Sequence, residues 1–207
     1  DSPELMFPMP HLTPDPSILD EKQTRSISAE NPRGEKGGGG RAPVPTDAET
    51  GEPTGPAREL GLGWKIRPYL DIPPGESATL MDVAGPGTIE SIWMTPTGAA
   101  YRDGILRMHW DGQDQPSVEV PLGDFFASAF TDYQTFAPLD SAMVAVNPGN
   151  AFNCYWPMPF REHARITLEN RTPGTNLRVF YQINYALGEV PERAAYFHAQ
   201  FRRCNPQ

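Results

Sequence analysis

The chain has 207 residues, of which 24 are proline and 19 are glycine, and its formal net charge is −9. This composition argues against a helical protein and favours many short strands joined by turns. The acidic balance, without clustered lysine and arginine, argues against nucleic acid as a partner, and no apolar stretch approaches the roughly 18 residues of a membrane span.

The beginning of the chain leaves the cellular compartment open. The sequence starts at Asp1 rather than at methionine and shows no signal peptide, which suggests processing or trimming. We therefore expect a soluble protein of unknown compartment, with secretion or export to the periplasm after signal removal among the alternatives.

Residues 1–62 are predicted to form an extended N-terminal arm rich in glycine and proline, with an unbroken tetraglycine at 37–40. Four glycines lose much conformational entropy on ordering, so this loop is either mobile or held closely against another backbone. It lacks the GxxxxGK[ST] order and no strand leads into it, which excludes a nucleotide-binding loop. A disordered tail is the alternative for the arm.

From Trp64 onward the sequence changes to short runs in which apolar residues alternate with others. Because successive side chains of a strand point to opposite sides of a sheet, these runs predict half-buried strands. In the first run, Ile89 is expected on the same face as Ser91 and Trp93. The runs cover residues 89–94, 106–110, 118–120, 164–169 and 177–185.

Turn signals separate the runs and set the fold class. Proline and glycine pairs supply the backbone angles that tight turns need, and we expect about eight or nine strands. The absence of a strand–helix–strand alternation argues against a parallel sheet. The prediction for residues 63–190 is an all-β antiparallel β-sandwich, in particular a jelly roll. The turn signals lie at 73–75, 85–87, 111–112, 147–149 and 173–174.

The last segment, 191–207, is predicted to form a short amphipathic C-terminal helix or linker. Pro191 is tolerated at a helix start, Glu192 suits the positive end of the helix, and Arg202 and Arg203 suit the negative end.

Five segments resemble one known family, and they are TRSISAENPRGEKGGGG (24–40), GPGTIESIWMT (85–95), LRMHWDGQDQPSVEVPLGDFF (106–126), NCYWPMPF (153–160) and ARITLEN (164–170). Together they are similar to the N-terminal half of the domain-of-unknown-function 2961 family. Its characterised members form glycoside hydrolase family 172 and act on α-fructofuranosides, including formation of difructose anhydrides, and on α-D-arabinofuranosides. The resemblance implies one half of a double jelly roll that assembles as trimers or hexamers.

The sequence departs from this family in one respect. The family's catalytic glutamates belong to the second jelly roll, in a GEGE-like and a GTEDYF-like block, and neither block occurs here. The resemblance therefore implies a sugar-binding context but no catalytic residue in this chain. It also implies that a partner chain or a further segment carries the second jelly roll.

Asp124 and Phe125 are the first candidates for sugar binding. An acid beside aromatic residues, on a loop held by a rigid scaffold, can bond vicinal hydroxyls and cover the apolar face of a ring. The alternative is that Asp124 caps backbone N–H groups while Phe125 and Phe126 enter the core. These two interpretations are about equally supported by the residues.

Tyr155 and Trp156 are the second pair of candidates, because their apolar bodies and polar tips suit a wet, concave site. Alternation sends neighbours to opposite faces of a strand, so only part of this set can share a pocket. A core position is equally supported for Trp156.

Glu30 and Asn31 form the third candidate, a polar pair just ahead of the tetraglycine. The family resemblance favours an arm that lines a sugar site or wraps a neighbouring subunit.

Two other patterns are assigned structural roles or none. Asp111 and Asp114 lie in a DGQD turn, where aspartate favours the turn by bonding its own backbone, and Glu119 is expected on the solvated face of a strand. The four histidines are scattered and no CxxC pair exists, so no metal site or cofactor is predicted.

Two hypotheses for the function follow. The first is a glycoside hydrolase-type protein acting on furanosides, with this chain supplying the first jelly roll and part of the sugar site. The second is a non-catalytic carbohydrate-binding or structural jelly-roll subunit of an oligomer, since a lone jelly roll exposes the surface that packs against its twin.

Overall fold

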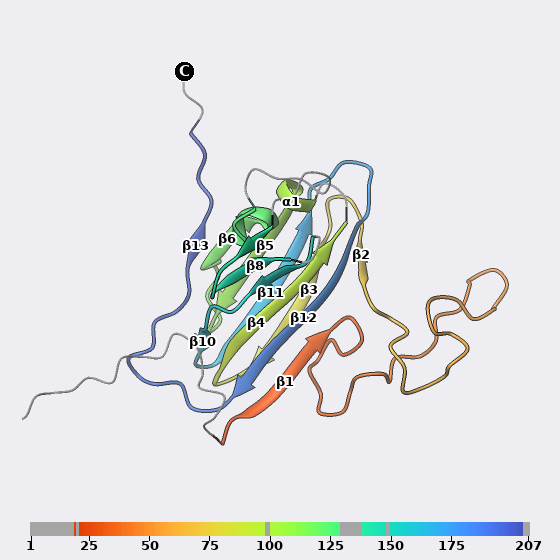
Figure 1. Ribbon diagram of the computed structural model, residues 1–207, viewed down its shortest axis with the longest axis horizontal. Helices are drawn as coiled ribbons and strands as arrows, with labels where there is room; N and C mark the ends of the chain where they lie inside the picture. Colours follow the sequence, from red (N-terminus) through yellow and green to blue (C-terminus); the bar gives the residue numbers. More distant parts are fainter. Residues whose placement is uncertain (1–18, 20, 98–99, 129–137, 148–149, 205–207) are drawn as a thin grey trace, which may run out of the picture.

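A computed structural model describes residues 19, 21–97, 100–128, 138–147 and 150–204. Two β-sheets face each other in this part of the chain (Figure 1). The strands of the first sheet are β1 (Gln23–Ser28), β2 (Leu70–Ile72), β4 (Gly87–Pro96), β7 (Leu139–Asp140), β8 (Val144–Val146), β9 (Phe152–Cys154), β10 (Met158–Phe160) and β12 (Leu177–Leu187). Those of the second are β3 (Ser77–Ala84), β5 (Gly104–Trp110), β6 (Val118–Pro121), β11 (His163–Asn170) and β13 (Ala199–Gln200).

The pairing within both sheets is almost entirely antiparallel. The first sheet has the order β1–β12–β4–β9–β8–β7, with β2 beside β12 and β10 beside β4, and the second has the order β13–β6–β5–β11–β3. Among the described strands, β13 and β6 are the parallel pair. Within the residues that the structure describes, helix is limited to two single turns, α1 (Ala100–Asp103) and α2 (Leu122–Phe125). The predicted all-β two-sheet sandwich is confirmed.

The core lies between the sheets and comes from the inward positions of their longest strands. Val179, Tyr181 and Ile183 of β12 are buried from one side, and Met108 and Trp110 of β5 from the other. This is the alternation that a half-buried strand requires, and burial of these apolar side chains drives the packing of the two sheets. No helix in the described part of the chain is long and apolar enough to cross a membrane.

The prediction that Ile89 shares a face of the sheet with Ser91 and Trp93 is wrong, because β4 contains a β-bulge. Ser91 opposes Asn184 and Ile89 opposes Tyr185, so Glu90 is an extra residue without a partner on β12. A bulge reverses the alternation beyond it. Ile89 therefore lies in the core, whereas Ser91 and Trp93 are only partly buried.

The N-terminal arm contributes a strand to the sandwich. All six residues of β1 pair with β12, and Ile27 is fully buried. The chain then leaves the sandwich as a long excursion, orange to yellow in Figure 1, and returns at Ile66. The tetraglycine lies at the base of this excursion, where the Gly40 carbonyl accepts a 2.8 Å hydrogen bond from the Gly63 N–H. A Cβ on Gly40 would lie 3.0 Å from that backbone, so the close approach requires glycine.

The predicted C-terminal helix is wrong. The described part of this segment has one turn near Pro191 and then runs extended, with β13 beside β6. Its carbonyls bond side chains of the sandwich: the Arg161 guanidinium donates to Glu192 and Ala194 at 3.0 and 2.7 Å, and the Trp110 indole donates to Phe197 at 2.8 Å. A short isolated helix is only marginally stable in water. The hydrogen bonds to Arg161 and Trp110 and the pairing with the edge strand β6 therefore favour the extended conformation over a helix.

Asp111 connects three parts of the fold. It and Gly112 have positive φ angles of 51° and 73° and are the two central residues of a tight turn, which the Gln113 N–H closes on the Trp110 carbonyl at 3.1 Å. Its Oδ1 accepts backbone hydrogen bonds from 161–163 at 2.8 to 3.0 Å, and its Oδ2 accepts one from the Tyr196 hydroxyl. The expected structural role holds, but the partners are the β10–β11 connection and the C-terminal segment rather than its own turn.

The hydrogen bonds of Asp111 make the protein sensitive to acid. Partial burial raises the pKa of the Asp111 carboxyl, but the bonds from Tyr196 and from the backbone of 161–163 outweigh burial and hold the pKa below its usual range. A depressed pKa contributes stability above the unfolded-state value of about 4, and this contribution is lost as the pH falls toward the folded value.

We expect Asp111→Asn to lower the free energy of unfolding by about 2 kcal/mol at pH 7. The difference from the wild type should shrink as the pH falls below about 4, because the wild type then loses the same charge. Urea denaturation at several pH values measures both. Asp114→Asn, at an exposed position of the same turn, is the control, and equal effects of the two variants at pH 7 would contradict this role.

Removal of the hydroxyl from the buried Tyr181 and from the half-buried Tyr196 should change the free energy of unfolding in opposite directions. Burial raises the pKa of Tyr181 to about 12, and its hydroxyl has no hydrogen-bond partner among the described residues. We expect Tyr181→Phe to raise the free energy of unfolding by about 1 kcal/mol, and Tyr196→Phe, which loses the bond to Asp111, to lower it by about 1 to 2 kcal/mol. Thermal melting would show shifts of about 2 to 4 °C per kcal/mol. A destabilised Tyr181→Phe would refute this assignment.

Candidate functional site

The first candidate site is a polar hollow of about 420 Å³, here called the glycine groove. Its walls come from β1, the turn after β1, the tetraglycine, Lys65 of the segment before β2 and one residue of β12, so it lies on the outer side of the first sheet. The lining residues are Thr24, Arg25, Ser26, Ser28, Glu30, Asn31, Glu35, Lys36, Gly37, Gly38, Gly39, Gly40, Lys65 and Gln182.

Glu30 is the buried carboxylate of this groove. Only 6% of the residue is exposed, and its Oε2 accepts a 2.7 Å hydrogen bond from the backbone N–H of Arg67. Its Oε1 is buried and has no hydrogen-bond partner within the described residues. Glu30 also lines a smaller hollow of about 300 Å³ that it shares with Arg41 and Arg67. A buried carboxylate oxygen of this kind is costly until a donor reaches it.

Asn31 shapes the groove wall. Its Oδ1 accepts a 3.1 Å hydrogen bond from the Glu35 N–H, and its Nδ2 donates to the Glu35 carbonyl at 2.9 Å. A Cβ on Gly38 would lie 2.6 Å from the Asn31 Oδ1, so the glycine loop folds directly over this amide. The amide oxygen and nitrogen of Asn31, which could otherwise bind a ligand, therefore hold the glycine loop in place.

A second hollow, of about 520 Å³, contains Asp124, Phe125 and Trp156. We call it the aromatic hollow. Phe125 is buried. Its ring packs edge-on against the Trp156 ring, with 5.2 Å between the ring centres, and Trp156 stacks on Phe197 with 5.4 Å between the ring centres. Tyr155 does not line this hollow and is 43% exposed. The other lining residues are Val120, Phe197, Ala199, Gln200 and Phe201.

Asp124 interacts with a side chain rather than with backbone N–H groups. Its carboxylate forms an ion pair with Arg102, and 16% of its side chain is exposed. The guanidinium of Arg102 also lies 5.2 Å from the centre of the Phe201 ring. The acid at this hollow is therefore already neutralised by a partner.

The predicted site residues thus separate into distinct places. Glu30 and Asn31 share the glycine groove, whereas Asp124, Phe125 and Trp156 share the aromatic hollow, and the two hollows have no lining residue in common. Tyr155 lines neither of them.

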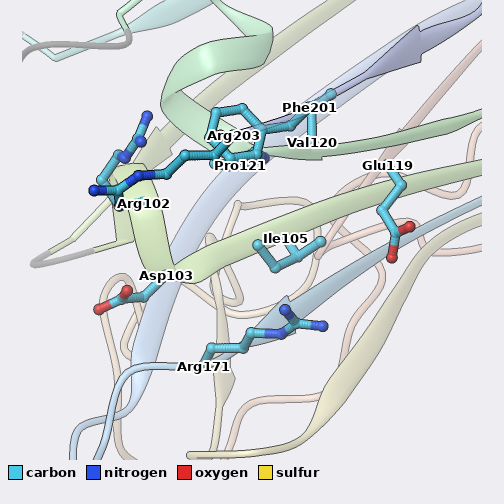
Figure 2. Close-up of a pocket in the computed structure, with 9 residues that line it drawn as sticks. All are labelled: Arg102, Asp103, Ile105, Glu119, Val120, Pro121, Arg171, Phe201 and Arg203. Atoms are coloured by element: carbon cyan, nitrogen blue, oxygen red, sulfur yellow. The ribbon is translucent and has the colours of Figure 1, made fainter. Parts of the chain in front are cut away.

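A third hollow, of about 530 Å³, was not foreseen from the sequence. Figure 2 shows Arg102 and Arg203 at one end of it, Glu119 at the other and Ile105 between them. It shares Val120 and Phe201 with the aromatic hollow. Two of its nine lining residues, Phe201 and Arg203, come from the C-terminal segment, which the sequence predicted to be helical.

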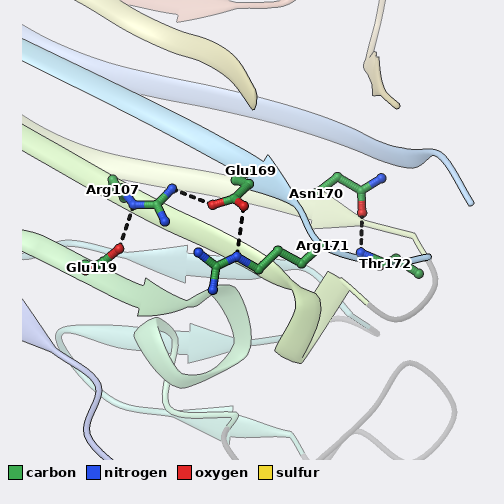
Figure 3. Close-up of polar contacts among 6 residues, drawn as sticks. All are labelled: Arg107, Glu119, Glu169, Asn170, Arg171 and Thr172. Atoms are coloured by element: carbon green, nitrogen blue, oxygen red, sulfur yellow. Dashed lines mark hydrogen bonds and ion pairs between the residues drawn. The ribbon is translucent and has the colours of Figure 1, made fainter. Parts of the chain in front are cut away.

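Carboxylates already balance Arg107 and Arg171 beside this third hollow (Figure 3). Arg107 bonds Glu119 at 2.8 Å and Glu169 at 2.7 Å, and Glu169 bonds Arg171 at 2.9 Å. The hydrogen bond from Arg171 lowers the pKa of the Glu169 carboxyl, partial burial opposes this, and Arg107 lowers it further. These four side chains form a row of paired charges on the surface of the second sheet. Within the described residues, no group of His, Cys, Asp and Glu is arranged to hold a metal ion.

Comparison with known proteins supports the family resemblance seen in the sequence. A search among curated proteins found no match. A family model described as the GH172 first β-sandwich domain matches residues 68–203, a span that includes the aromatic hollow and excludes all of the glycine groove except Gln182. That span covers more than half of the chain, and the chain therefore belongs to the GH172 family, whose first β-sandwich domain it contains.

Proposed function

We propose that this chain supplies the first sandwich of a glycoside hydrolase that acts on furanosides, either α-fructofuranosides or α-D-arabinofuranosides. In this proposal the glycine groove forms part of the sugar site. The observation that carries it is the Glu30 carboxylate, which is 6% exposed and has one oxygen without a partner among the described residues. Family membership supports the reaction class.

The groove offers the chemistry that a sugar needs. Each hydroxyl both donates and accepts hydrogen bonds. The Glu30 Oε1 can accept from a hydroxyl, while Lys65 and the Gln182 amide, which also line the groove, can donate. A neutral polyol satisfies such a mixture better than an anion does, because an anion would have to lie against the buried carboxylate.

The chemical step is assigned to a second sandwich, in keeping with the family resemblance. Glycoside hydrolysis needs two carboxyl groups on either side of one bond, roughly 5 to 10 Å apart. In the proposal, those groups come from the second jelly roll, and the sandwich described here is the first half of a double jelly roll. A homo-oligomer, trimeric or hexameric, or a partner chain would then complete the site.

The aromatic hollow favours a second candidate function, that of a non-catalytic carbohydrate-binding or structural subunit. Trp156 and Phe197 lie in this hollow beside the exposed Phe201, an arrangement that suits the apolar face of a sugar ring or a packed neighbouring domain. Light scattering distinguishes the structural role, which requires oligomers, because a strict monomer at high concentration would exclude it.

Glu30→Gln tests the glycine groove. The amide keeps the shape of the side chain but replaces an acceptor with a donor, so we expect arabinofuranoside or fructofuranoside binding to weaken at least about tenfold, the loss for one charged hydrogen bond. Isothermal titration calorimetry with methyl furanosides measures it. Glu59→Gln, at a side chain 86% exposed on the excursion, is the matched control. Equal affinities of the two variants would remove Glu30 from the site.

The assignment of catalysis to a second sandwich predicts binding without turnover by this chain. We expect no release of nitrophenol from aryl α-D-arabinofuranosides or α-fructofuranosides when the chain is alone. Hydrolysis should appear when a segment with the GEGE and GTEDYF blocks is supplied. Turnover by the chain alone would contradict the assignment, and inactivity with the second segment present would refute the enzymatic function.

A further inference from the structure

One row of side chains crosses the outer face of the first sheet, starting at the glycine groove. Ser28 of β1 pairs with Gln182 of β12, Gln182 pairs with Trp93 of β4, and Trp93 pairs with Asn153 of β9. Residues that are paired across adjacent strands point to the same side of a sheet. Ser28 and Gln182 line the groove, so Trp93 lies on the next strand beyond the groove wall.

The indole of Trp93 belongs to this outer face and not to the core. Its neighbours Ile92 and Met94 are buried between the sheets, whereas Trp93 is only partly buried and is not among the hydrophobic residues packed against the core. The position is unusual for so large an apolar side chain, because burial of an aromatic residue in the core stabilises a fold and an outward position forgoes that gain.

Polar groups that are already ordered surround the indole. The Gln182 Nε2 donates to the Asn184 Oδ1 at 3.0 Å, and the Asn184 Nδ2 donates to the Ser91 hydroxyl at 3.0 Å. On the other side, the Asn153 Nδ2 donates to the Ala145 carbonyl at 3.3 Å. An indole flanked by side-chain amides of fixed orientation offers a stacking surface for a sugar ring and hydrogen-bonding groups for the hydroxyls of that sugar.

We propose that Trp93 is the platform for a second sugar ring, so that the ligand of the groove is an oligosaccharide rather than a single furanoside. This inference rests on the proposed sugar-binding function of the glycine groove. Two strand spacings separate Ser28 from Trp93, about 10 Å in the hydrogen-bonding direction, which exceeds the width of one five-membered ring. A ligand that fills the groove and reaches the indole must therefore contain at least two linked rings.

The length dependence of binding tests this proposal. Calorimetry on the full chain would compare a methyl α-D-arabinofuranoside with the linked disaccharide and tetrasaccharide. For the wild type we expect affinity to rise about tenfold from one ring to two, the gain from covering on the order of 55 Å² of apolar ring surface. Trp93→Ala should bind the monosaccharide as the wild type does and lose this rise, and Trp93→Phe should retain part of it.

Trp64→Ala is the matched control, because Trp64 is 56% exposed on the excursion and does not line the groove. It should keep the wild-type rise, and thermal melting of each variant checks that it folds. If no form binds even the monosaccharide, the proposed function fails. If the wild type binds one ring and two equally well, only the Trp93 proposal fails. A Trp93→Ala variant that changes the mass in light scattering and not the sugar affinity would make this face a contact between copies, and would overturn the proposal.

Discussion

The hydrogen bonds that the Asp111 carboxylate accepts are the interactions on which the arrangement of the second sheet depends. This carboxylate lies in the turn that follows β5, and it accepts hydrogen bonds from the backbone before β11 and from Tyr196 in the C-terminal segment. Strands that are distant in sequence are thereby fixed at one end of the sandwich. Since the C-terminal segment supplies Phe197 and Phe201, the aromatic hollow also owes its shape to this carboxylate.

Much of the sandwich could be predicted because its strands carry a clear period of two. Strands β5, β11 and β12 follow the alternation of their sequences, and the family resemblance named the correct family. Two errors have physical causes. The bulge at Glu90 depends on pairing with β12, and the extended C-terminal segment depends on donors such as Arg161. Neither set of partners is visible in a local pattern.

The candidate site was only partly accessible from the sequence. Glu30 stood out as a polar residue beside the tetraglycine, but its burial depends on Arg67, 37 residues away. Trp93 lay in a predicted strand, yet its place next to the groove follows from the strand order β1–β12–β4. The charge row of Arg107, Glu119 and Glu169 likewise needs three strands to meet. Residue types can indicate chemistry, whereas long-range pairing decides which of them share a surface.

The excursion between β1 and β2 is joined to the sandwich at a narrow neck. Its two ends meet through the Glu30–Arg67 hydrogen bond and the Gly40–Gly63 hydrogen bond. The entropy of closing a loop grows only with the logarithm of its length, so doubling such a loop costs about 0.6 kcal/mol. Insertions and deletions in 43–60 therefore change the folding free energy little as long as the neck persists. The tip of the excursion can thus change in length and sequence while the sandwich and the groove wall, which contains no residue of 43–60, stay the same.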